Sequence, residues 1–152
     1  MRYEIAGRGH ELMLQGELYH FLGWIARSAE EPSHRGRETG KEYVELAMEY
    51  IRNHFQEDLT VAKLARYVGL NRSYLTTVFQ SVLQMSPQQF LMRFRMTRAA
   101  QLLRENNLSV GEVARSVGFA SASYFTECFK RYLHTTPLAY RRDSGEKRVA
   151  GL

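Results

Sequence analysis

LSVGEVARSVGFASASYFTECFKRYLHTTP, residues 108–137, repeats the pattern of LTVAKLARYVGLNRSYLTTVFQSVLQMSP, residues 59–87. Both copies contain Ala-Arg-x-Val-Gly in the first half and Ser-Tyr-x-Thr in the second. Matching residues lie 49 positions apart before the turn and 50 after it, because the second copy has one extra residue there. Two copies of one pattern at fixed spacing predict two copies of one structural unit.

The first copy predicts two short helices joined by a turn. Thr60 can cap a helix over residues 61–68, which ends at Gly69. Asn71 can cap a second helix, over roughly residues 72–83.

The second copy predicts the same arrangement. Ser109 and Glu112 have the form of a capping box, and the helix that they begin ends near Gly118. Ser121 can cap the next helix, over roughly residues 122–133. This is the helix-turn-helix plan, in which the N-terminal residues of the second, recognition helix contact base edges in the major groove.

One long helix is predicted between the two units, over residues 87–105. Ser86 can cap it, Pro87 suits its first position, and Gln89 completes a capping box. A helix of nineteen residues is about 28 Å long. Such a rod can hold two recognition helices about one turn of DNA apart, roughly 34 Å, on one face of the duplex.

The remaining segments also favour helices. Apolar residues recur at helical spacing over residues 41–55, and Thr136-Pro137 opens a last short helix through Tyr140. No long stretch alternates with period two, as a strand would. The predicted fold class is therefore all-α, with two helix-turn-helix subdomains joined by a long connecting helix.

The N-terminal part predicts an amphipathic helix over residues 11–28, followed by a linker rich in Gly, Ser and charged residues. The predicted division is residues 1–40 as helix and linker, residues 41–142 as the DNA-binding domain, and residues 143–152 as a flexible tail. The exposed apolar stripe of the first helix predicts either weak self-association, as a homodimer, or packing on the DNA-binding domain. Its apolar face comprises Leu14, Leu18, Phe21, Leu22 and Ile25.

Charge and cysteine content narrow the function. Residues 41–152 contain sixteen Lys or Arg and ten Asp or Glu, a net charge of +6, which suits a polyanionic partner. The single cysteine, Cys128, cannot form an internal disulfide, and we expect a cytoplasmic protein with no membrane span. The five histidines show no metal-ligand spacing and no catalytic motif occurs, so the sequence predicts no metal, no cofactor and no enzyme.

The two units resemble the DNA-binding domain of the AraC/XylS family of bacterial transcription regulators. The second unit is the more similar, with Val117-Gly118-Phe119, Ser123-Tyr124-Phe125, Phe129-Lys130 and Tyr140-Arg141 at the family's spacing. The resemblance covers about residues 41–142. It implies seven helices, two recognition helices in adjacent major grooves of double-stranded DNA, and contact with RNA polymerase. Residues 11–28 resemble the helix that closes the sensor domain of many members, so we expect either a C-terminal fragment of a longer regulator or a truncated natural protein.

The resemblance also implies roles for individual residues. Candidate base contacts in the two recognition helices are Arg72, Ser73, Thr76, Thr77, Ala122, Ser123, Thr126 and Glu127. Candidate phosphate contacts are Lys130, Arg131, Arg141 and Arg142, besides Arg72. The opposite, core-facing side comprises Tyr74, Leu75, Val78, Phe79, Tyr124, Phe125, Cys128 and Phe129. Small polar base contacts predict modest direct readout, with more discrimination left to DNA shape.

Four residues carry further expectations: Glu127, Arg95, Gln84 and His134. Glu127 can accept a hydrogen bond from cytosine N4 or pair with Arg131 one turn later, and the sequence leaves both open. Arg95, in the connecting helix, is expected to form a structural ion pair. Gln84 and His134 occupy places where the family usually has Gly, so a positive φ there would cost some stability.

Two other functions fit parts of this pattern. A helical module of the same plan could contact RNA polymerase or another regulator without binding DNA. A DNA-repair methyltransferase fused to such a domain would need a reactive cysteine, whereas Cys128 aligns with Val78 and is expected to be a buried core residue. The basic segment and the groove-compatible spacing favour a sequence-specific DNA-binding regulator.

Overall fold

The computed structural model describes residues 40–150, with side chains for residues 40–144. The regular secondary structure of this part of the chain is all α-helix, without strands, which confirms the predicted fold class. The predicted amphipathic helix over residues 11–28 lies outside the described residues. The helices in chain order are α2 (Gly40–His54), α3 (Val61–Val68), α4 (Arg72–Leu83), α5 (Pro87–Glu105), α6 (Val110–Ser116), α7 (Ala122–Leu133) and α8 (Pro137–Ala150).

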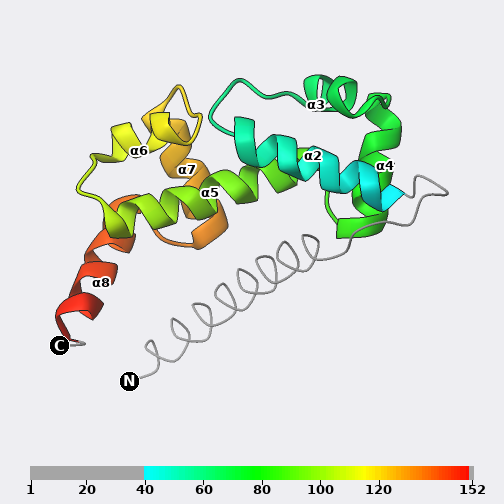
Figure 1. Ribbon diagram of the computed structural model, residues 1–152. Helices are drawn as coiled ribbons and strands as arrows, with labels where there is room; N and C mark the ends of the chain where they lie inside the picture. Colours follow the sequence, from blue (N-terminus) through cyan, green and yellow to red (C-terminus); the bar gives the residue numbers. More distant parts are fainter. Residues whose placement is uncertain (1–39, 151–152) are drawn as a thin grey trace. The chain divides into compact units, whose positions relative to one another are not determined.

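The first unit is built from α2, α3 and α4. Helix α2 packs against both of the others, and α3 packs on α4 (Figure 1). One face of α2 is completely buried, as its apolar spacing predicts. The core of this unit comprises Val44, Ala47, Met48, Ile51, Leu64, Ala65, Val68, Leu75, Val78 and Phe79.

The second unit is built from α6, α7 and α8, which pack against α5 and partly against each other. Its core is aromatic: Phe125 lies between Phe119 and Phe129, with ring centroids 5.4 and 5.6 Å away. Cys128 is buried among these residues, as predicted. Figure 1 shows α3 and α4 toward one end of α5, and α6, α7 and α8 toward the other.

Capping side chains define the helix starts. Thr60, Asn71 and Ser121 each accept a hydrogen bond from a backbone N–H in the first turn of α3, α4 and α7. Capping boxes begin α5 and α6, as the sequence predicts. The predicted starts and ends of α3, α4, α5 and α7 agree with the structure.

The last helix is longer than predicted. The sequence predicted a short helix through Tyr140 and a flexible tail over residues 143–152, whereas α8 continues to Ala150. The physical reason is that residues 141–150 contain no proline, and their one glycine does not stop the helix.

Gln84 and His134 both have left-handed backbones, with φ of 57° and 55°. Each residue ends a recognition helix, where its backbone N–H binds the carbonyl oxygen four residues earlier. The sequence left open whether these turns need a positive φ, and the structure shows that both have one at a non-glycine residue.

Candidate nucleic-acid interface

The candidate base contacts lie on the solvent side of α4 and α7. Six of the eight are exposed, and Thr76 and Thr126 are half-buried. The opposite sides of both helices are anchored in the cores by Leu75, Val78, Phe79, Phe125, Cys128 and Phe129, all buried. The structure thus presents one row of small polar residues on each recognition helix, at matching positions of the repeat.

The threonine hydroxyls of these rows already donate hydrogen bonds. Thr76 and Thr77 donate to the carbonyl oxygens of Arg72 and Ser73, and Thr126 donates to that of Ala122, over 2.9 to 3.0 Å. In this arrangement each hydroxyl can still accept a hydrogen bond, and each methyl group remains available. These threonines therefore suit adenine N6 or cytosine N4 donors and thymine methyl groups.

Tyr74 and Tyr124 are not in the core, so the prediction that they face the core was wrong. They are 48% and 52% exposed. Each is the third residue of its helix and lies one position before the buried Leu75 or Phe125, which turns it by about 100° toward the edge of the core. Tyr124 lies against the Phe119 ring, with centroids 5.8 Å apart. Each tyrosine directly follows a candidate base contact in the sequence, Ser73 or Ser123.

Of the candidate phosphate contacts, Lys130, Arg131 and Arg142 are exposed. Arg142 pairs with Asp143, with 3.2 Å between Nε and Oδ1. Among residues 40–144 the salt bridges do not include a Glu127–Arg131 pair, so the exposed Glu127 carboxylate is left for other contacts.

Arg141, predicted as a phosphate contact, forms hydrogen bonds within the protein. Its guanidinium is part-buried and donates hydrogen bonds to the carbonyl oxygens of Leu103 and Leu108. These carbonyls lie at the end of α5 and in the loop before α6, so Arg141 ties α8 to that loop. Bonded in this way, the part-buried guanidinium is directed toward these carbonyl oxygens.

Arg95 also differs from its prediction. Instead of an ion pair, it forms hydrogen bonds from Nε and Nη2 to the carbonyl oxygens of Phe55 and Glu57, each over 2.8 Å. Its guanidinium carbon lies 5.7 Å from the centre of the Phe119 ring. Burial lowers the pKa of Arg95, and the charge of Asp58 opposes that shift. A guanidinium remains protonated at any physiological pH, so the side chain is a permanent cation in this position.

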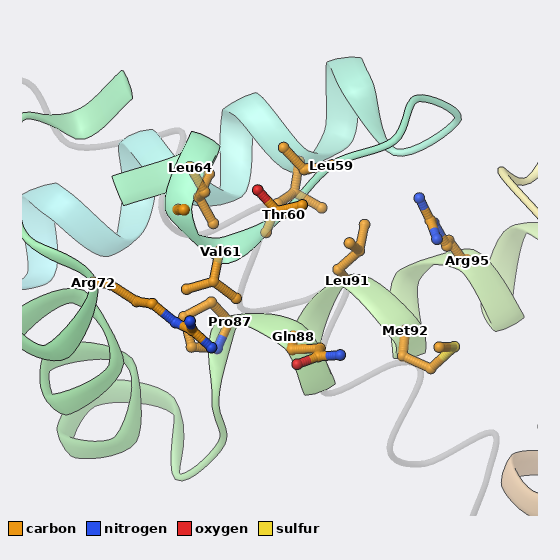
Figure 2. A pocket seen from close by; sticks show the side chains of 12 residues that line it. Leu59, Thr60, Val61, Leu64, Arg72, Pro87, Gln88, Leu91, Met92 and Arg95 are labelled. Carbon is orange, nitrogen blue, oxygen red and sulfur yellow. The ribbon is translucent and has the colours of Figure 1, made fainter. Parts of the chain in front are cut away.

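A shallow pocket of about 370 Å³ lies between the start of α3 and the first half of α5. Figure 2 shows Arg72 at one side of it and Arg95 at the other, with Val61 and Leu91 between them. Within the part of the chain that the structure describes, no cluster of His, Cys, Asp and Glu could hold a metal ion. No described helix is long and apolar enough to cross a membrane.

A family model described as a helix-turn-helix domain matches residues 64–143, just over half of the chain. Curated relatives and solved structures that match are AraC-type regulators. The chain belongs to the AraC/XylS family of transcription regulators. The resemblance identified from the repeat is therefore confirmed.

Two relatives illustrate the match to the family. The Msm operon regulatory protein of Streptococcus mutans is 32% identical over 137 residues, which cover 88% of this chain and 49% of that protein. The raffinose operon regulator RafR of Pediococcus pentosaceus is 36% identical over 104 residues, covering 68% of this chain and 38% of that protein. The chain thus spans less than half the length of these AraC-type relatives.

Solved structures show the same fold. The DNA-binding domain of AdpA, in complex with a target DNA, has a TM-score of 0.64 and 31% identity, covering 74% of this chain and 97% of that one. A DNA-binding dual regulator of Escherichia coli K-12 has a TM-score of 0.63 and 28% identity, covering 75% and 99%. The two helix-turn-helix units are therefore those of an AraC-type DNA-binding domain.

Proposed function

We propose that this chain binds double-stranded DNA sequence-specifically, with α4 and α7 in successive major grooves of one face of the duplex, and so regulates transcription. The observation that carries this proposal is the pair of recognition helices on one helix, α5. Each begins at a capping residue and presents a row of small polar residues to solvent. The related AdpA domain, solved in complex with a target DNA, supports DNA binding by this fold.

In this proposal the two rows of small polar residues contact bases, and the basic residues near them contact phosphates. Ser73, Thr76 and Thr77 would contact one block of bases, and Ser123, Thr126 and Glu127 another. Arg72, Lys130 and Arg131 would bind phosphates and set the position of the helices on the duplex. These groups bind without forming or breaking covalent bonds, so we propose a regulator and not an enzyme.

The proposal is tested by selecting a duplex of about 20 base pairs from a random pool and titrating it at increasing KCl. The logarithm of affinity should fall linearly with the logarithm of salt, by about 0.9 per phosphate neutralised. Thr77→Ala should relax discrimination in one block only, and Ser123→Ala only in the other. Binding that does not respond to salt, or selection of no duplex, would instead support a module that binds proteins alone.

For the whole regulator we further propose contact with RNA polymerase, as the family resemblance implies, and self-association through residues 11–28. Sedimentation of the full chain against residues 41–152 tests the second proposal. Equal sedimentation of the two as monomers contradicts it.

A further inference from the structure

Two segments from different parts of the chain meet at Arg95 of α5. The loop after α2 contributes the carbonyl oxygens of Phe55 and Glu57, and the turn between α6 and α7 contributes Gly118 and Phe119. We call these five residues the inter-unit joint. The loop belongs to the first helix-turn-helix unit and the turn to the second.

The approach at Gly118 is closer than any side chain allows. A Cβ placed there would lie 2.7 Å from the carbonyl oxygen of Phe55 and 2.9 Å from Nη2 of Arg95. Gly118 also has a φ of +88°, which disfavours any L side chain. The backbones of the two units therefore touch at this point.

The guanidinium of Arg95 suits a joint because its planar donors are held in fixed directions. Two of them bind carbonyl oxygens on the first unit while the cation faces the Phe119 ring on the second. A lysine would keep the charge but could not reproduce the two directed hydrogen bonds. One side chain thus fixes the loop of one unit against the turn of the other.

We infer that Arg95 is a positioning residue for DNA recognition: it holds the two helix-turn-helix units at one separation and rotation, and so determines the spacing between the base blocks that the protein accepts. The inference rests on the proposed function, because it concerns how DNA is recognised. Each unit has its own core, so loss of the joint should loosen their relative placement without unfolding either.

The first arm of the test needs no DNA. Nitroxide labels on Gln80→Cys and Lys130→Cys, both exposed positions on the recognition helices, report the distance between α4 and α7 by pulsed electron paramagnetic resonance. Cys128→Val removes the competing thiol. Arg95→Lys should broaden the distance distribution. The matched control is Arg98→Lys on the same helix, where the arginine is exposed and donates a hydrogen bond to Gln101 three residues later, and it should leave the distribution unchanged. A distribution in Arg95→Lys as narrow as that of the parent would overturn the inference.

The second arm uses the duplex selected by the full-length wild-type chain, and derivatives with one base pair added or removed between the two blocks. The wild type should prefer the parent spacing by about tenfold or more, since one base pair rotates the second block by about 34°. In Arg95→Lys this preference should shrink severalfold, and Phe119→Leu should shrink it less. Equal weakening at all spacings would show that Arg95 serves stability alone. Failure of the wild type to select a duplex would contradict the proposed function, and the first arm would still decide whether the joint holds the units together.

Discussion

Gly69 and Gly118 occupy the same place in the two helix-turn-helix units, yet they are needed for different reasons. Both follow Ala-Arg-x-Val, both have a positive φ, and both donate a backbone hydrogen bond to the arginine carbonyl three residues earlier. A Cβ at Gly69 would meet no atom within 4 Å, whereas one at Gly118 would strike the Phe55 carbonyl and Arg95. The turn at Gly69 does not contact the other unit through this position. The turn at Gly118 packs against the Phe55 carbonyl of the first unit and against Arg95.

The largest difference is therefore expected between two identical substitutions. Gly69→Ala adds only the cost of a left-handed alanine, about 1 kcal/mol of unfolding free energy. Gly118→Ala adds the same strain and a clash with backbone, and should lose about 3 kcal/mol or more. Urea denaturation of the two variants measures both values. Equal losses would mean that the close approach at Gly118 relaxes freely and that the two turns are equivalent.

Within the second unit, the neighbouring residues Arg141 and Arg142 are expected to differ in their contribution to stability. Arg141→Ala removes two hydrogen bonds from a charged donor to the carbonyls of Leu103 and Leu108, and should cost about 1.5–3 kcal/mol of stability. The adjacent Arg142→Ala should leave stability within about 0.5 kcal/mol, because its exposed pair with Asp143 contributes little. Thermal and urea unfolding distinguish the two. A stable Arg141→Ala protein with a reduced salt slope would return Arg141 to the phosphate contacts.

The ends of the recognition helices should behave alike in both units. Gln84→Gly and His134→Gly each remove a left-handed side chain and should stabilise the protein by about 1 kcal/mol. The two sites lie in separate units, so their effects should add. Differential scanning calorimetry of the single and double variants tests this. A gain at one site only would indicate that the contacts of the other side chain offset the strain of its left-handed backbone.

The smallest expected effect concerns the starts of α3 and α6. Hydrogen bonds with Ser109 lower the pKa of Glu112 below its ordinary value of 4.5, whereas the matching residue of the first unit is Lys63. A carboxylate with a lowered folded pKa contributes stability above its unfolded pKa and loses it as the pH falls through the folded value. The stability difference between wild type and Glu112→Gln should therefore begin to shrink as the pH falls below 4.5 and vanish once the pH lies below the folded pKa of Glu112. A difference that persists in acid would exclude the ionised capping box as its source.

Local signals in the sequence predicted most of the fold. Thr60, Asn71, Ser86 and Ser121 stand where helices begin, and such capping depends only on residues three or four positions away. The candidate base contacts, which were assigned from the family resemblance, also lie on the solvent side, six of them exposed and two half-buried.

The features that the sequence did not predict depend on contacts between residues far apart in the chain. Nothing near Arg95 or Arg141 indicates that their guanidinium groups bind carbonyl oxygens more than thirty residues away. The exposure of Tyr74 and Tyr124 depends on how far the core extends along each recognition helix. One feature of the repeat could have indicated the inter-unit joint. The second copy has an extra residue after Gly118, so its turn differs from that of the first copy.

The central claim is that one rigid helix, α5, carries both recognition helices to base blocks about one turn of DNA apart, roughly 10 base pairs. Footprinting and affinity measurements on the selected duplex with insertions between the blocks test it most directly. A five-base-pair insertion places the second block on the opposite face, and affinity should collapse toward that of a single unit. A ten-base-pair insertion should not rescue binding, because α5 cannot lengthen by a further turn of about 34 Å. Wild-type affinity and a full two-block footprint on the ten-base-pair insertion would contradict the account.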